Sequence, residues 1–142
     1  MTILPQFGNV FLTLIYFVVA LSIIVGVHEY GHYIVGRWSG IKAEVFSIGF
    51  GPVLFAREDK HGTVWQIAAI PFGGYVKFLG DANAASGKDG EAMEAMAAEQ
   101  LRHTMHGAPL WARSATVLAG PVFNFIFSIF VFAGLLLSLG MV

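Results

Sequence analysis

Two histidines and one glutamate near the start of the chain combine residue types and a spacing that suit a catalytic metal ion. His28 and His32 are four residues apart, so on a helix both imidazoles lie on the same face. Two neutral imidazoles are two of the three protein ligands that a catalytic zinc ion needs, and a position is left for water. Glu29 directly follows His28, so its carboxylate can take a proton from that water without binding the metal. The motif therefore predicts zinc-dependent hydrolysis with Glu29 as the base.

The pattern His-Glu-x-x-His also arises by chance, so its position in the chain decides how much it means. It comes at the end of an apolar run, where ionisable groups are costly and are usually functional. The alternative is that these residues end a helix at a membrane surface, where water satisfies the imidazoles. Gly31, inside the motif, has no Cβ and would permit close approach of another helix or of a substrate.

Two stretches are apolar enough to cross a membrane. Residues 10–27 carry no charge and would span roughly 27 Å as a helix, close to the ~30 Å hydrocarbon core of a bilayer. Residues 114–142 also lack charged side chains, and the whole chain is 56% hydrophobic and only 12% charged. We predict a membrane α-helical fold with transmembrane helices at 8–38 and 110–140. Two buried helices of a soluble protein are the alternative.

The basic residues predict how the chain lies in the membrane. All eight fall between the two apolar stretches, at Arg37, Lys42, Arg57, Lys60, Lys77, Lys88, Arg102 and Arg113. The positive-inside rule then puts the connecting segment in the cytoplasm and both termini outside, in a multi-pass protein of the cell inner membrane. A cysteine placed at Ser86 should therefore be shielded from membrane-impermeant reagents in intact cells. A net charge of −1 gives no sign of a nucleic-acid partner.

The connecting segment predicts a membrane-associated β-region followed by a loop. β-branched and aromatic residues favour strands at 44–48, 53–55, 63–67 and 75–78, with a hairpin turn at 58–62 and breaks at 49–52 and 71–74. The β-region as a whole covers 44–78. Residues 79–108 predict a flexible cytoplasmic loop at 80–90 and a surface helix at 91–103.

Four motifs stand in the order and spacing of a known family. They are His-Glu-Tyr-Gly-His at 28–32, Phe-Ser-Ile-Gly-Phe-Gly-Pro at 46–52, Ile-Pro-Phe-Gly-Gly-Tyr-Val-Lys at 70–77 and Ala-Gly-Pro-Val-Phe-Asn at 119–124. With these motifs, residues 8–135 resemble the site-2 protease family and are most similar to its bacterial RseP-type members. The resemblance implies that His28 and His32 bind Zn²⁺ and that Glu29 is the catalytic base. It implies cleavage of transmembrane segments of single-pass membrane proteins within the lipid bilayer, in regulated intramembrane proteolysis.

The resemblance also implies where substrate binds. The family's β-structure helps to bind substrate, which points to Gly49, Gly51, Gly73 and Gly74, and the asparagine of the last motif, here Asn124, lies near its active site. A substrate helix must unwind before a metal can reach its carbonyls, and an exposed strand edge offers the unwound segment backbone partners. The alternatives are that Asn124 joins two helices by hydrogen bonding and that the glycines form turns.

The family's third zinc ligand is an aspartate in a later transmembrane helix, and this chain contains no such segment. Its own remaining candidates are expected to be solvated surface residues: Asp81, Asp89, His61, His103 and His106. We therefore expect residues 1–142 to be the N-terminal part of a longer protease core, without the PDZ domains of RseP-type members. The alternatives are a non-catalytic relative or fragment that binds transmembrane segments through its β-edge, and a structural or transport metal site. The second apolar stretch has no ionisable residue, which argues against transport.

Overall fold

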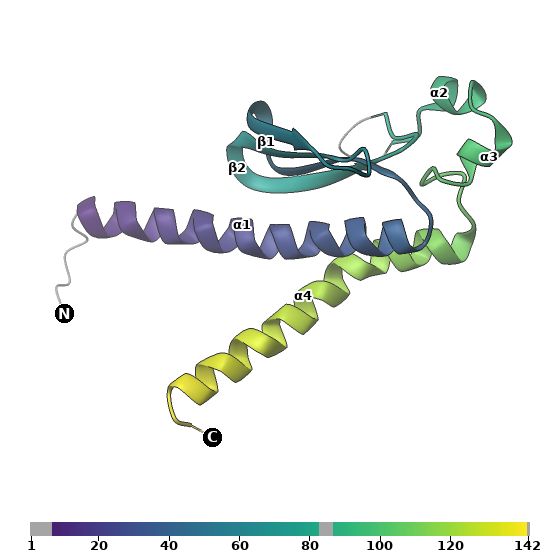
Figure 1. The fold of residues 1–142 in the computed structure, drawn as a ribbon. Helices are drawn as coiled ribbons and strands as arrows, with labels where there is room; N and C mark the ends of the chain where they lie inside the picture. The colour runs from purple at the N-terminus through teal and green to yellow at the C-terminus, as the bar shows by residue number, and fades with distance from the viewer. Residues whose placement is uncertain (1–6, 83–86, 142) are drawn as a thin grey trace.

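Two long helices leave a shared end of the molecule and diverge, with a sheet packed on the first of them (Figure 1). The computed structural model describes residues 7–82 and 87–141. The elements in chain order are α1 (Phe7–Trp38), β1 (Ala43–Glu58), β2 (Val64–Phe78), α2 (Gly90–Glu94), α3 (Ala98–Leu101) and α4 (Leu110–Ser138). The two ends of the described chain lie on the same side, away from α2 and α3.

Helix α1 ends where the sequence predicts, because the chain turns there in a Schellman motif. Gly40 takes the left-handed conformation with a φ of 86°. The N–H of Gly40 bonds the carbonyl of Arg37 at 3.1 Å, and the N–H of Ile41 bonds that of Gly36 at 2.8 Å. These bonds satisfy carbonyls at the end of the helix, and the apolar Ile41 is buried against its last turns.

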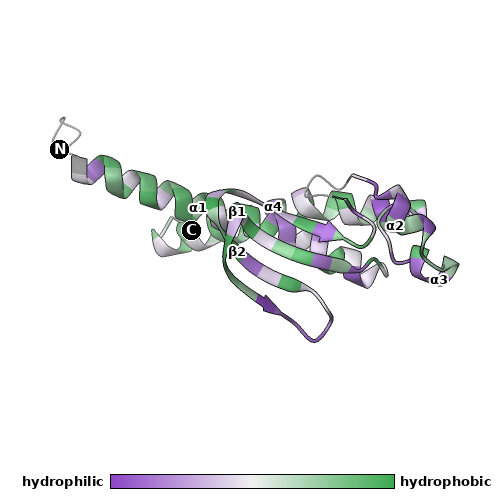
Figure 2. Ribbon diagram, turned by 90° about the horizontal axis from the view of Figure 1, so that it is seen from above, coloured by the Kyte–Doolittle hydropathy of each residue, from purple (hydrophilic) through white to green (hydrophobic). Residues whose placement is uncertain are grey.

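Both long helices are long and apolar enough to cross a membrane, as the sequence predicts. None of the most apolar stretch of α1 is buried within the chain, and only 6% of that of α4 is. The core helix of a soluble protein would bury this surface, so the two helices fit a membrane protein. Figure 2 shows hydrophobic residues along α1 and hydrophilic residues at the hairpin tip and around α2 and α3.

The sheet consists of two long antiparallel strands rather than the four short ones that the sequence predicts. The predicted strands 44–48 and 53–55 are parts of β1, and the predicted strands 63–67 and 75–78 correspond to β2. Gly49, at a φ of 91°, bends β1 where the sequence predicts a break. The first half of β1 lies between the two halves of β2, since Ile48 is opposite both Gly74 and Ile67. The second half of β1, residues 53–58, pairs with β2 on one side only and forms an exposed edge.

The core lies where the sheet meets the C-terminal half of α1. Its buried members come from α1, both strands, the connection between α1 and β1, and the residues around the start of α4: Tyr33, Ile34, Ile41, Ala43, Phe46, Val76, Phe78, Ala108 and Ala112. The Tyr33 ring packs edge-on against Phe46 and Trp65, whose rings stack with centroids 4.5 Å apart. This aromatic cluster holds the sheet on the helix that carries the His-Glu-x-x-His motif.

The predicted surface helix at 91–103 is wrong, because the structure divides it into α2 and α3 with Ala97 extended between them. The division has a packing cause. A Cβ on Gly80 would contact Thr104 at 3.1 Å and Met93 at 3.4 Å, so both side chains pack at one point. One straight helix would separate them by roughly 16 Å.

The expectation that Asp81 is a solvated surface residue is also wrong. Its side chain is buried, and Oδ2 accepts the N–H of Phe78 at 2.9 Å. Asp81 pairs with Lys88 in an isolated β-bridge, so the described ends of the predicted loop lie side by side. Ser86, the proposed labelling position, lies outside the described residues.

Candidate metal centre

Two glycines let α1 and α4 cross closely at the His-Glu-x-x-His motif. A Cβ on Gly31 would lie 2.5 Å from the carbonyl oxygen of Ala119. A Cβ on Gly120 would lie 2.5 Å from Nε2 of His32 and 2.8 Å from Nε2 of His28. Because real Cβ atoms do not approach other atoms so closely, a side chain at position 120 would occupy the space in front of both imidazoles.

The two imidazoles converge on one point, as their spacing predicts. The Nε2 atoms of His28 and His32 are 3.1 Å apart, and the ring planes are nearly perpendicular. Each ring is also fixed from behind by α4. Nδ1 of His32 faces the carbonyl oxygen of Thr116 at 2.8 Å, and Nδ1 of His28 faces the side-chain amide of Asn124 at 3.1 Å.

The contact with Thr116 fixes the protonation pattern of His32. A carbonyl oxygen can only accept, so Nδ1 of His32 must carry the proton and donate it. In the neutral ring, Nε2 then has a free lone pair. Metal-binding histidines commonly have their second ring nitrogen held in this way, which orients the ring and selects the metal-binding tautomer.

The contact with Asn124 can likewise select the metal-binding tautomer of His28. The amide nitrogen of Asn124 faces Nδ1 of His28, while the amide oxygen Oδ1 is buried without a hydrogen-bond partner. A half-turn of the amide exchanges the two atoms with almost no change of shape. Oδ1 would then accept a proton from Nδ1 of His28, which satisfies the orphaned oxygen and frees Nε2. The residues present therefore fit a metal ion held by two imidazoles.

Glu29 lies one residue along α1 from His28 and is partly buried. Within the described residues its carboxylate forms no hydrogen bond and no ion pair. A carboxylate without a committed partner is free to accept a proton. Its place beside the imidazole pair, on the same helix turn, suits the role that the motif predicts for it.

A third ligand is not found in the part of the chain that the structure describes, where no group of three or more His, Cys, Asp or Glu residues could hold a metal ion. The other candidates are engaged elsewhere. His61 contacts Arg37, and His103 contacts the carbonyl of Gly40. Asp89 accepts the N–H of Ala92 at the start of α2.

A small cavity opens beside His28 on the α4 side. It has a volume of about 290 Å³ and is lined by His28, Pro121, Asn124, Phe125 and Ser128. Pro121 has no N–H, so it leaves a backbone carbonyl one turn earlier in α4 without its helical partner. The cavity therefore opens onto His28 from a face that carries both polar and apolar groups.

Sequence reasoning missed three residues of this site, although a pattern in α4 could have indicated them. Thr116, Gly120, Asn124 and Ser128 recur at intervals of four, a small or polar stripe in an otherwise apolar helix. This spacing places them on one helix face. The four family motifs point only to Asn124 among these, whereas the structure shows that Thr116, Gly120 and Ser128 face the site with it.

The four glycines predicted to bind substrate lie in the sheet. A Cβ on Gly74 would meet Ser47 at 2.6 Å and Val25 at 3.0 Å, so the sheet touches α1 one turn before His28. The nearest neighbours of Gly49, Gly51 and Gly73 are other sheet residues rather than the imidazoles. The structure therefore places Gly74 against α1 one turn before His28, and it places Gly49, Gly51 and Gly73 within the sheet, away from the imidazole pair.

Comparison with known proteins identifies a family that covers most of the chain. The profile described as peptidase family M50 matches residues 16–141. A protein of Agrobacterium fabrum that carries the provisional name zinc metalloprotease Atu1380 is 55% identical over 82% of this chain and 31% of its own length. Metalloprotease MmpA of Caulobacter vibrioides is 46% identical over 84% of this chain and 32% of its length. Regulator of sigma-E protease RseP of Salmonella typhimurium is 44% identical over 82% of this chain and 24% of its own length. The chain thus spans about a third or less of the length of these relatives.

Proposed function

Since this chain belongs to peptidase family M50, we propose that it carries the zinc-binding part of a membrane-embedded endopeptidase that cleaves transmembrane segments of other proteins. Membership in the family confirms the resemblance inferred from the four sequence motifs. The observation that carries the proposal is the imidazole pair, whose Nε2 atoms lie 3.1 Å apart with both rings held from behind by α4. A pair held in this way is prepared to bind one metal ion between the rings.

Each residue of the site has a separate proposed role. His28 and His32 would hold Zn²⁺, and Gly120 keeps the space in front of them clear. When bound, zinc supplies a Lewis acid that polarises a peptide carbonyl and increases the acidity of water. The carboxylate of Glu29 takes the proton from the attacking water and returns it to the leaving amine. Asn124 orients His28 through its amide oxygen, a positioning role in place of the substrate contact that the resemblance implies.

The surroundings of the site support a transmembrane segment as the substrate. We propose that α1 and α4 span the inner membrane, with the connecting segment in the cytoplasm and both termini outside. A transmembrane substrate must unwind before it is cut, because its carbonyls are paired within its own helix. The exposed edge at 53–58 would offer the unwound segment backbone partners. Gly49 and Gly51 bend β1 ahead of this edge, and Gly73 and Gly74 let β2 pass close to β1 and α1.

The third zinc ligand must come from outside the described residues, and we propose an aspartate of another transmembrane helix. The relatives named above are about three times longer than this chain or more, which leaves room for such a helix. The alternative function is a non-catalytic relative that binds transmembrane segments through the 53–58 edge. The presence of only two candidate ligands among the described residues is what favours that alternative.

The test is the zinc content of the full-length protein purified in detergent, beside His32→Ala and Glu29→Gln. We expect about one zinc per chain in the wild type, as in other catalytic sites of this donor set, and a loss of that zinc in His32→Ala. Glu29→Gln should retain zinc but lose cleavage of a membrane-anchored substrate. Little zinc in the wild type, or unchanged cleavage in Glu29→Gln, would overturn the enzymatic proposal in favour of the binding module.

A further inference from the structure

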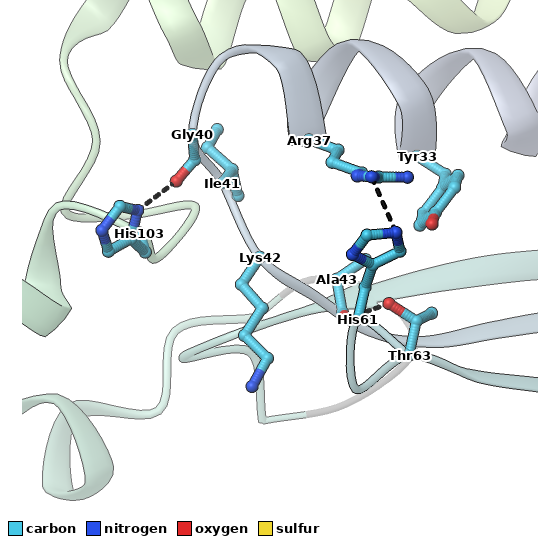
Figure 3. Close-up of a pocket in the computed structure, with 9 residues that line it drawn as sticks. All are labelled: Tyr33, Arg37, Gly40, Ile41, Lys42, Ala43, His61, Thr63 and His103. Atoms are coloured by element: carbon cyan, nitrogen blue, oxygen red, sulfur yellow. Dashed lines mark hydrogen bonds between the residues drawn. The ribbon is translucent and has the colours of Figure 1, made fainter. Parts of the chain in front are cut away.

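A second cavity, unrelated to the imidazole pair, lies at the C-terminal end of α1 (Figure 3). It has a volume of about 240 Å³ and is lined by Tyr33, Arg37, Gly40, Ile41, Lys42, Ala43, His61, Thr63 and His103. These residues come from the last turns of α1, the connection to β1, the hairpin turn and the segment after α3. Arg37 is nine residues beyond His28, roughly 13 Å along the helix axis.

The lining of this cavity has an excess of hydrogen-bond donors. Nη2 of Arg37 donates to Nε2 of His61 at 2.8 Å, because a guanidinium has no acceptor. The neutral His61 ring must therefore carry its proton on Nδ1. Arg37 retains further N–H groups, and Lys42 contributes an ammonium with three donors.

The acceptors in the lining are already engaged. The carbonyl oxygen of Gly40 faces Nδ1 of His103 at 2.5 Å, so the ring nitrogen is the donor. The carbonyl oxygen of Ala43 accepts the hydroxyl of Thr63 at 2.8 Å. The two backbone oxygens, which would otherwise repel an anion, thus accept hydrogen bonds from side chains that also line the cavity.

No carboxylate balances the charge of this lining within the described residues. Neither Arg37 nor Lys42 belongs to an ion pair there, since the pairs found are Lys77 with Glu44 and His106 with Asp81. The carboxylate of the hairpin turn, Asp59, is not part of the lining. Its two oxygens accept three protein N–H groups, from His61, Thr63 and Trp65. Arg37 and Lys42 therefore contribute two positive charges to the lining without an ion-pair partner among the described residues.

We propose that this cavity binds a phosphate group. A phosphate presents several acceptor oxygens in different directions, which matches a guanidinium, an ammonium and an imidazole N–H that come from different segments. The favoured source is the headgroup of an anionic phospholipid. Trp38 and Trp111, which are 73% and 62% exposed, lie at the ends of α1 and α4 as an interfacial aromatic belt would place them. A bound headgroup would join the end of α1 to the hairpin turn.

The test uses the full-length protein in a neutral detergent, titrated separately with inorganic phosphate and with phosphatidylglycerol. The ring NMR signals of His61 and His103 report binding in the cavity. A saturable shift with the lipid supports the headgroup as the source, and a shift with inorganic phosphate alone supports a free phosphate. Absence of a saturable shift with either probe would overturn the proposal.

A matched pair of double variants separates this cavity from general attraction of basic residues to anionic lipid. Arg37→Gln with Lys42→Gln removes the two charges of the lining. Arg57→Gln with Lys60→Gln removes two exposed charges of the same hairpin that do not line the cavity. Each charge lost near a membrane weakens general binding by about fivefold. We expect the first pair to weaken binding about tenfold more than the second, and equal losses would overturn the proposal.

Discussion

The imidazole pair and the basic cavity lie on the same helix, α1, but they are constructed in different ways. At the imidazole pair, a second helix crosses so closely that Gly120 cannot carry a side chain, and each ring is held from behind. At the basic cavity, exposed side chains from four segments surround an open space. The first arrangement suits a small ion that requires fixed geometry. The second suits a larger anion, around which long side chains can adjust.

The largest expected effect comes from filling the space that Gly120 leaves. Gly120→Ala would place a methyl group 2.5 Å from Nε2 of His32, so zinc binding by the full-length protein should be abolished. Gly134→Ala is the matched control, because a Cβ there meets nothing within 4 Å. Zinc content and far-UV circular dichroism would be measured for both variants. Zinc retained in Gly120→Ala would contradict the fixed geometry of the site.

The next effect tests the role of Asn124 at the same centre. Asn124→Leu removes the partner of His28 and should weaken zinc affinity about 10–100-fold, as for other residues that orient a ligand. Asn124→Asp keeps an acceptor for Nδ1 of His28 and should stay close to the wild type. Zinc Kd values from competition with a chelator provide the measurement. If Asp weakens binding as much as Leu, the amide acts through its nitrogen and the proposed orientation is wrong.

A smaller effect separates the two regions from each other. His32→Ala should leave the phosphate-dependent shift of His61 unchanged, and the Arg37→Gln, Lys42→Gln variant should still hold its zinc. We expect changes of less than about twofold in each case, because the sites share no contact and distant effects are usually additive. A larger cross-effect would mean that the two ends of α1 act as one unit.

The smallest effect concerns the hairpin turn beside the basic cavity. Burial raises the pKa of Asp59, but hydrogen bonds from Trp65, Thr63 and His61 outweigh it, so the pKa lies below its usual value. A carboxyl group of this kind stabilises the fold above its unfolded pKa and loses that effect as the pH falls through the folded pKa. Asp59→Ala should therefore speed amide hydrogen exchange at Thr63 near neutral pH, with the difference fading in strong acid.

Glu58→Gln is the control for this comparison, because within the described residues Glu58 makes no such bonds with the turn. Equal exchange at Thr63 in Asp59→Ala and in the wild type, at neutral pH, would show that the turn does not depend on the carboxylate. The hydrogen bond from the N–H of His61 to Asp59 would then not be what places His61 beside Arg37.

What the sequence by itself determines here is local. The spacing of His28 and His32 fixes both imidazoles on one face wherever a helix forms, and Ser39-Gly40 ends that helix through the backbone freedom of glycine. The polar residues between the two strands likewise predict the hairpin turn near residues 59–63, where Gly62 takes a positive φ. Each of these features depends on residues within one turn of structure, so pattern and propensity are sufficient to predict them.

What only the tertiary structure decides is which distant groups arrive at those local features. The carbonyl of Thr116 reaches His32 from 84 residues away, and Asn124 reaches His28 from 96 residues away. His103 lines the basic cavity through its contact with the carbonyl of Gly40, 63 residues away. The carboxylate of Asp81 is buried, and it accepts the backbone N–H of Phe78 there. Spacing along the chain carries no information on such contacts, because they depend on how helices and strands pack. The motif therefore indicates the chemistry, and the crossing of α1 and α4 determines its geometry.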